Sequence, residues 1–175
     1  MKTVAMSLTL AFVVAGSYFL ISPAEPNSEK PRAVLTWNTL DEGIALAKQS
    51  NKKILVDVYT DWCSWCKKMD KDVYTNPSVI GALNASFVVV KLNAESSKKV
   101  TFNNQKLTEE QFSRSAGVTA FPTTLFLDKN ATPITALPGF VPADKFAKII
   151  QFIGEDHYKT TSFQDFISRP PSANQ

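Results

Sequence analysis

Short apolar runs alternate with amphipathic stretches along most of this chain. The apolar runs are rich in β-branched residues and predict strands at residues 54–59, 87–92, 123–127 and 133–137. The first two are almost continuously apolar, which is typical of strands covered on both faces. Helical spacing predicts helices at residues 39–50, 64–73, 78–83 and 108–117, a long one after Pro142, and a small one from Ser162. This alternation predicts an α/β fold with helices on both faces of a sheet.

Polar residues set the limits of the predicted elements. Asn38 or Thr39 is suited to cap the first helix, and Ser78 to cap the third. Thr108 and Gln111 have the spacing of a capping box for the fourth. The stretch 93–106 is polar and predicts a loop. These signals place the folded domain at residues 34–168, after a polar linker at 25–33 and before a disordered tail at 169–175.

The N-terminal segment, residues 1–24, has the features of an export signal. Lys2 precedes an apolar run from Val4 to Ile21, and a small-x-small pattern ends at Ala24, where a signal peptidase can cut. The run is longer than a usual signal core of about 7–15 residues and approaches the roughly 20 that span a bilayer. We favour a cleaved signal peptide over a retained membrane anchor. Either places the remaining chain in the periplasm or otherwise outside the cytoplasm.

Composition narrows the classes of function. The chain has 175 residues, 44% hydrophobic and 20% charged, which suits one domain with a full core. Its formal net charge is +3, from 19 basic and 16 acidic residues. The basic residues are scattered as pairs without an interleaved aromatic ladder, so we expect no nucleic-acid partner. We expect a monomer.

The two cysteines, Cys63 and Cys66, are the strongest chemical signal in the sequence. A bridge between residues three apart closes a very small loop and removes little entropy from the unfolded chain, so a structural staple is disfavoured. The predicted strand–helix junction places Cys63 at a helix N-terminus, where backbone N–H groups and the helix dipole favour a thiolate. Cys66 lies on the same helical face and can resolve a mixed disulfide formed at Cys63.

Metal binding is the other common use of a C-x-x-C pair. Zinc requires about four ligands, whereas this chain offers no further cysteine and a single histidine, His157. We therefore expect no zinc site and no cofactor. Copper(I) suits thiolates, so a binding module that delivers copper or acts as a chaperone stays open as the alternative function.

The run from Val56 to Lys67 resembles the active-site signature of thioredoxins. Its continuation through Val79 is similar to exported thioredoxin-like proteins and to the C-terminal domain of the transmembrane disulfide reductase DsbD. The similarity covers about residues 37–153. It implies a thioredoxin fold with a mixed sheet of four to five strands, and a redox-active Cys63–Cys66 disulfide.

The resemblance also implies roles for residues outside the pair. Asp57 matches the buried aspartate that takes a proton from the resolving cysteine, and Lys91 matches the lysine beside it. Each is a lone charge in an otherwise apolar strand, and a buried charge is costly unless it is paired. Phe121 and Pro122 match the cis-proline segment beside the cysteines, where the backbone of Phe121 offers hydrogen bonds to a substrate.

Three further residues complete the predicted substrate-binding groove. Trp62 and Trp65 flank the cysteines, and Gly139 matches a glycine that lines the same groove in thioredoxins, although a plain turn also explains it. The chain departs from thioredoxins in the Ser64–Trp65 dipeptide between the cysteines. Its segment 93–115 is also longer, and this segment either shapes partner choice or is an indifferent loop.

These features predict an extracytoplasmic thiol–disulfide oxidoreductase, acting as a reductase of disulfide-containing exported proteins. Because no reductant pool is expected outside the cytoplasm, a membrane electron donor must re-reduce it. The residues between the cysteines tune the reduction potential, but the direction of electron flow does not follow from the sequence.

Overall fold

The computed structural model describes residues 34–168 of the chain. The predicted signal peptide or anchor at 1–24, the linker at 25–33 and the tail at 169–175 lie outside the described residues. Within residues 34–168, no helix is both long and apolar enough to span a bilayer.

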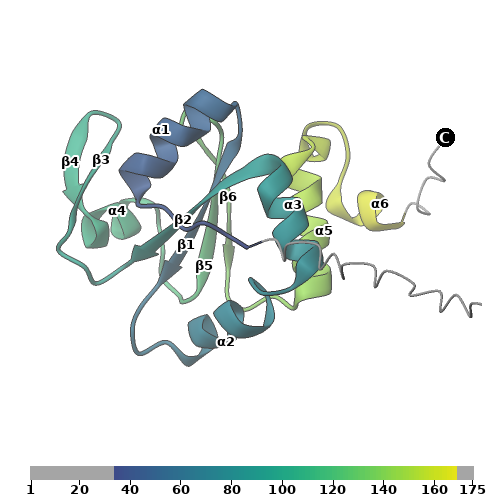
Figure 1. Ribbon diagram of the computed structural model, residues 1–175, viewed down its shortest axis with the longest axis horizontal. Helices are drawn as coiled ribbons and strands as arrows, with labels where there is room; N and C mark the ends of the chain where they lie inside the picture. The colour runs from purple at the N-terminus through teal and green to yellow at the C-terminus, as the bar shows by residue number, and fades with distance from the viewer. Residues whose placement is uncertain (1–33, 169–175) are drawn as a thin grey trace, which may run out of the picture. The chain divides into compact units, whose positions relative to one another are not determined.

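The strands form one four-stranded sheet and one separate hairpin (Figure 1). The strands are β1 (Lys53–Tyr59), β2 (Phe87–Asn93), β3 (Lys99–Phe102), β4 (Gln105–Thr108), β5 (Thr123–Leu127) and β6 (Pro133–Pro138). The main sheet has the order β2-β1-β5-β6, with β1 parallel to β2 and antiparallel to β5, and β5 antiparallel to β6. This is a mixed sheet of four strands, as the resemblance to thioredoxins implies.

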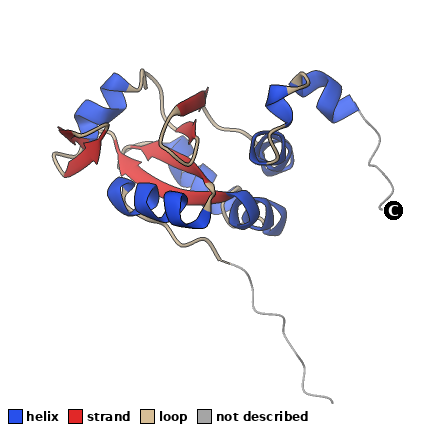
Figure 2. Ribbon diagram, turned by 90° about the horizontal axis from the view of Figure 1, so that it is seen from above, coloured by secondary structure: helices blue, strands red, loops and turns tan. Residues whose placement is uncertain are grey.

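The helices lie on both sides of the strands (Figure 2). They are α1 (Leu40–Ser50), α2 (Ser64–Asp72), α3 (Pro77–Ser86), α4 (Glu109–Ser115), α5 (Ala143–Gly154) and α6 (Phe163–Ser168), with a 3-10 turn at His157–Lys159. Alternation along β1 explains the two layers, because successive side chains of a strand point to opposite faces. Leu55 packs with α2, α3 and α5, whereas Ile54 and Val56 pack with α1 and α4.

Several predicted helix starts are confirmed. Thr39 caps α1 in a capping box with Glu42, and Thr108 caps α4 in a capping box with Gln111. The predicted cap at Ser78 is wrong. Asn76 is the cap instead, because its side chain accepts a hydrogen bond from the Ser78 N–H at 3.0 Å. The helix begins at Pro77, and proline suits this position because the N–H groups of a first helical turn have no intrahelical partner.

The predicted loop at 93–106 is also wrong in part, because β3 and the first half of β4 lie within it. The hairpin turns at Asn103 and Asn104, both of which adopt positive φ angles of 49° and 63°. Asparagine tolerates this conformation better than most residues, and two such residues match the twist of a tight hairpin. The sequence pattern did not predict these two strands because each has only four residues, and Val100 is the one buried residue among the eight.

Candidate active site

Cys63 and Cys66 form a disulfide at the start of α2. Cys63 is the N-cap residue, and its Sγ accepts a hydrogen bond from the Cys66 N–H at 3.0 Å. Upstream, the Cys63 N–H donates to the carbonyl oxygen of Thr60 at 3.2 Å, which fixes the turn from β1 into the helix. The N–H groups of a first helical turn lack intrahelical partners and favour negative charge. This position is therefore suited to hold the Cys63 sulfur as a thiolate once the disulfide opens.

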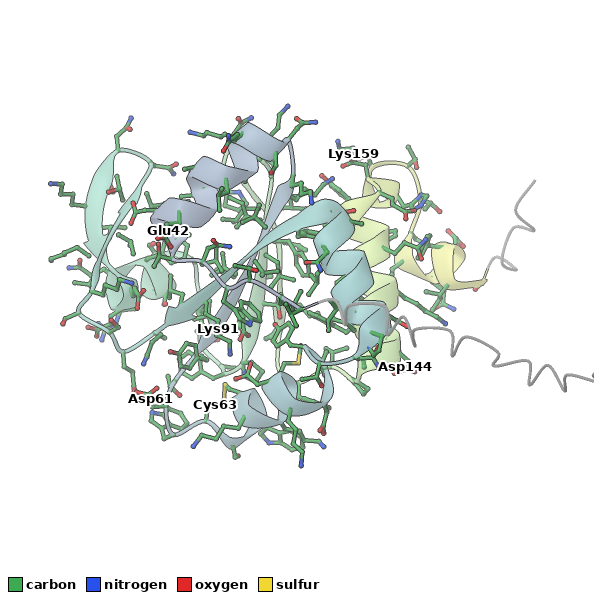
Figure 3. The ribbon with its side chains drawn as sticks, viewed as in Figure 1. Glu42, Asp61, Cys63, Lys91, Asp144 and Lys159 are labelled. Atoms are coloured by element: carbon green, nitrogen blue, oxygen red, sulfur yellow. A yellow bond between two sulfur atoms is a disulfide. The ribbon has the colours of Figure 1, made fainter. Side chains whose placement is uncertain are left out.

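Two exposed indole rings flank the buried cysteines. Cys63 and Cys66 are 4% and 3% exposed, whereas Trp62 and Trp65 are 66% and 55% exposed. Large apolar side chains usually lie inside a protein, and adjacent exposed ones indicate a contact surface for another molecule. Figure 3 shows Asp61 and Cys63 close together where the chain enters α2.

Each indole packs against a phenylalanine from a distant loop. The ring centroids of Trp62 and Phe121 are 5.9 Å apart, in an edge-to-face arrangement, and those of Trp65 and Phe140 are 5.4 Å apart. The ammonium of Lys68 lies 5.5 Å from the centroid of Phe140. Phe140 was missed by sequence reasoning, and its place directly after Gly139 was the available signal. Each cysteine of the disulfide thus directly follows an indole that packs against another aromatic ring.

The Phe121–Pro122 peptide bond is cis, as the resemblance implies. Pro122 is buried, and its carbonyl oxygen accepts a hydrogen bond from the Gly139 N–H at 2.7 Å. Gly139 adopts a positive φ of 84°, a conformation that costs glycine little. The Gly139 N–H thus fixes the backbone at Pro122. The ring contact between Phe121 and Trp62 joins the same loop to the residue before Cys63.

Asp57 and Lys91 form an ion pair between β1 and β2. The parallel register of β1 and β2 sets these two residues directly opposite each other, and Lys91 Nζ lies 3.1 Å from Asp57 Oδ2. Asp57 is 1% exposed, and neither of its carboxylate oxygens accepts a well-aligned hydrogen bond from any described residue. Burial raises the pKa of Asp57 above its ordinary value, and the charge of Lys91 opposes this rise without cancelling it.

Sequence reasoning missed the second partner of Lys91. Its ammonium donates to the carboxylate of Asp70, which lies on α2 one turn after Cys66. The four-residue spacing from Cys66 was the available signal, since residues i and i+4 share a helix face. Burial alone would lower the pKa of Lys91, but Asp57 and Asp70 outweigh it and raise that pKa. Lys91 therefore stays charged between two carboxylates.

Aromatic side chains complete the surroundings of Lys91. Its ammonium lies 4.9 Å from the ring centroid of Tyr59, 5.2 Å from that of Trp37 and 5.9 Å from that of Tyr74. Such rings attract a cation through their electron-rich faces. An open pocket of about 670 Å³ borders these residues and Asp70. The lysine thus links a buried carboxyl group to an opening on the surface.

The described residues support thiol chemistry at this place. Within residues 34–168, no group of three or more histidine, cysteine or acidic side chains has the arrangement of a metal site. The site instead combines a sulfur pair at a helix start with a buried titratable carboxyl group.

Comparisons with known proteins agree with this geometry. Residues 40–154 match the family model described as a thioredoxin-like domain. The chain is 33% identical over 116 residues to the thiol:disulfide interchange protein DsbD of Vibrio vulnificus, covering 65% of this chain and 18% of that protein. It therefore spans about a fifth of the length of that curated relative. An uncharacterized protein of Caenorhabditis elegans is 32% identical over 103 residues, covering 59% of this chain and 14% of its own length.

Solved structures show the same fold. A thioredoxin-fold protein of Helicobacter pylori is 25% identical with a TM-score of 0.59, covering 67% of this chain and 83% of its own. A thioredoxin of Thermus thermophilus is 25% identical with a TM-score of 0.56, covering 68% and 86% respectively. The family match spans more than half of the chain and contains both cysteines of the disulfide. This chain belongs to the thioredoxin-like family of thiol–disulfide oxidoreductases.

Proposed function

We propose that the protein reduces disulfides of exported protein partners. The Cys63 thiolate attacks one sulfur of the partner disulfide, a Cys63–partner bond forms, and the other partner sulfur leaves as a thiolate. Cys66 then gives its proton to Asp57 and attacks the Cys63 sulfur. This step releases the second partner thiolate and restores the Cys63–Cys66 disulfide, so two electrons have moved to the partner.

One observation supports this proposal most strongly: the sulfur pair lies at the N-terminus of α2, and the preceding strand β1 carries a buried, poorly hydrogen-bonded carboxyl group at Asp57. A raised carboxyl pKa is suited to a group that must accept and return a proton near neutral pH. In this scheme Lys91 keeps the charged form of Asp57 accessible. Trp62, Trp65, Phe121, Pro122 and Gly139 form the surface on which the partner segment lies.

The wider setting is also a proposal. The apolar N-terminal run supports export, and the partners are then exported proteins with accessible disulfides. Two electrons must return to Cys63–Cys66 after each turnover, and we assign that step to a membrane electron donor. The similarity to DsbD, a thiol:disulfide interchange protein, supports both assignments.

Insulin reduction in the presence of dithiothreitol tests the activity. We expect the wild-type protein to accelerate insulin precipitation and Cys63→Ser to be inactive. Cys66→Ser retains the nucleophile without the resolver, so we expect it to accumulate a mixed disulfide with insulin, visible on a non-reducing gel. Full activity of Cys63→Ser would overturn the proposal.

The reduction potential of the Cys63–Cys66 pair tests the direction. Equilibration with glutathione or dithiothreitol buffers gives this potential directly. A value near about −270 mV fits a reductase like thioredoxin, and one near about −120 mV fits an oxidant and would overturn the proposed direction.

A further inference from the structure

The ring of Trp62 is held by a residue that no step of the proposed chemistry uses. Its Nε1–H donates to Glu95 Oε1 at 2.9 Å, while the indole and the ring of Phe121 pack edge-to-face. An indole that is two-thirds exposed would otherwise be free to change rotamer. A hydrogen bond on one side and a ring contact on the other restrict it to one orientation beside Cys63.

Glu95 can restrain this ring because its own backbone is anchored. The Ala94 N–H donates to the carbonyl oxygen of Tyr59 at 2.9 Å, which joins the end of β2 to the end of β1. The side chain of Asn93 accepts from the Glu95 N–H at 2.9 Å and donates to Asp61 Oδ2 at 3.2 Å. Asn93 therefore ties Glu95 to the residue directly before Trp62.

The segment that carries Glu95 is anchored at its far side as well. The Glu110 N–H at the start of α4 donates to the carbonyl oxygen of Ser96 at 3.2 Å, and the Glu109 N–H donates to that of Lys98 at 2.9 Å. Residues 93–98 are thus a connection fixed to β1 and to α4. These residues open the segment 93–115, which the resemblance to thioredoxins predicts to be longer in this chain.

We infer that Glu95 is a positioning residue that holds Trp62 against Phe121 as one wall of the partner-binding groove. The inference rests on the proposed function, and it assigns the segment 93–115 a part in partner selection. If the indole is already ordered in the free protein, binding of a partner loses no side-chain entropy at Trp62. Ordering one such side chain changes affinity by roughly two- to tenfold. A disulfide too small to reach the wall gains nothing from it.

The effect therefore depends on the size of the disulfide. We expect Glu95→Ala to slow oxidation of the reduced protein by insulin by roughly two- to tenfold, and to leave the rate with 2-hydroxyethyl disulfide unchanged. Glu95→Gln keeps an acceptor oxygen at the same place, so we expect it to retain the wild-type rate with both. Glu110→Ala removes a half-exposed acid of the segment 93–115 that pairs with Arg114 and not with Trp62, and it is the matched control.

A spectroscopic measurement follows the ring itself. In 15N-labelled protein, we expect the Trp62 indole N–H signal to shift and its heteronuclear NOE to fall in Glu95→Ala, but not in Glu95→Gln or Glu110→Ala. Trp62→Phe keeps a ring but lacks the N–H donor. Adding Glu95→Ala to it should have no further effect on the insulin rate.

The outcomes separate the two proposals. An unchanged indole signal in Glu95→Ala, or equal rate losses with insulin and with 2-hydroxyethyl disulfide, would overturn the positioning role. A wild-type protein that reduces neither disulfide would overturn the proposed function, and the indole measurement would still report on Glu95.

Discussion

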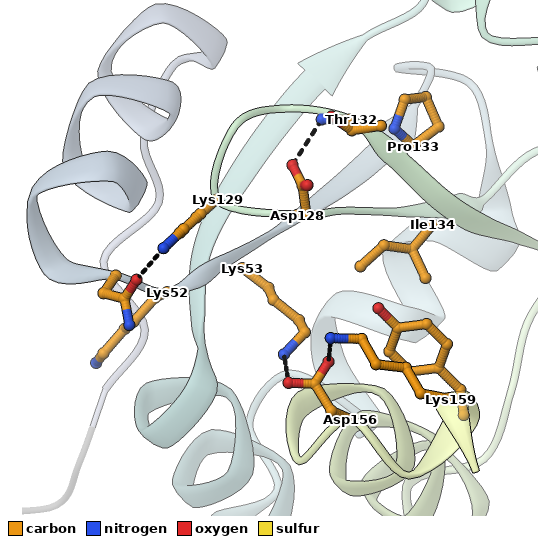
Figure 4. Close-up of a pocket in the computed structure, with 11 residues that line it drawn as sticks. Lys52, Lys53, Asp128, Lys129, Thr132, Pro133, Ile134, Asp156 and Lys159 are labelled. Atoms are coloured by element: carbon orange, nitrogen blue, oxygen red, sulfur yellow. Dashed lines mark hydrogen bonds and ion pairs between the residues drawn. The ribbon is translucent and has the colours of Figure 1, made fainter. Parts of the chain in front are cut away.

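Two lysine–aspartate clusters of this protein have opposite compositions. At the active site, one lysine, Lys91, lies between the carboxylates of Asp57 and Asp70. Near the start of β1, one carboxylate, Asp156, lies between two lysines, with Lys53 Nζ at 3.2 Å and Lys159 Nζ at 2.9 Å. Figure 4 shows this second cluster at the edge of a pocket of about 550 Å³.

The pKa values of the two aspartates shift in opposite directions. Burial raises the pKa of Asp57, although Lys91 is adjacent. Burial would also raise the pKa of Asp156, but hydrogen bonds and charge from Lys159 and Lys53 outweigh it and lower that pKa. The Asp57 side chain is 1% exposed, whereas that of Asp156 is 44% exposed. The balance between desolvation and the lysine interactions decides which form of each carboxyl group is favoured.

Asp57→Asn should have the largest effect, because it removes the buried carboxyl group that we propose as the proton acceptor. We expect the resolving step to slow by about 100-fold at pH 7, in the range usual for loss of a general base. Single-turnover oxidation of the reduced variant by insulin, measured from pH 5 to 9, checks this. Wild-type rates across that range would exclude Asp57 as the proton acceptor.

The same variant should change how stability depends on pH. Because the folded pKa of Asp57 is raised, its contribution to stability is complete below the unfolded pKa of about 3.9 and is lost as pH rises through the folded pKa. Urea unfolding of the oxidised wild type should therefore show this loss, and Asp57→Asn should lack it. Matching pH profiles would contradict the raised pKa.

Lys91→Met should have the next largest effect, because it leaves Asp57 buried without its cation. We expect the pKa of Asp57 to rise further and the activity profile to move to higher pH. We also expect the oxidised protein to lose about 1–3 kcal/mol at pH 8, the cost of an unsatisfied buried polar group, and less at pH 5, where a larger fraction of Asp57 is protonated. Equal losses at both pH values would contradict this account.

Asp70→Asn should have a smaller effect in the opposite direction. Without the Asp70 carboxylate, Lys91 pairs only with Asp57, and a negative charge near Asp57 is removed. We therefore expect the pKa of Asp57 to fall and the activity profile to move to lower pH. The change in stability should stay below about 1 kcal/mol, because Asp70 is 46% exposed. Asp72→Asn, on the same helix and paired with Lys68, is the matched control and should leave the profile unchanged.

Asp156→Asn should have the smallest effect. Asparagine tolerates the positive φ of 63° at this position, so the change removes charge without straining the backbone. The folded pKa of Asp156 is lowered, so its contribution is present above the unfolded pKa and is lost as pH falls through the folded pKa. We expect a loss of about 0.2–1 kcal/mol at pH 7 by urea unfolding, and wild-type activity. An altered activity profile would show that the two clusters are coupled.

Local patterns made much of the fold and the centre of the site predictable. Apolar runs predicted the strands of the main sheet. The capping-box spacing predicted the N-cap of α4, and Thr39 was one of two residues predicted to cap α1. Asp57 and Lys91 stood out because a charge inside an apolar strand needs a partner. The hairpin β3–β4 was missed because its strands are short and mostly exposed.

By itself the sequence determined the elements of the main sheet and the spacing that sets two sulfurs at a helix start, because these depend on neighbours within a few residues. Only the tertiary structure decided that Asp70 shares Lys91, that Phe140 packs on Trp65 and that Glu95 holds Trp62. Each of these contacts joins residues that are far apart in the sequence. Whether these residues come into contact depends on strand register and helix packing, and the local sequence pattern around each residue does not determine either.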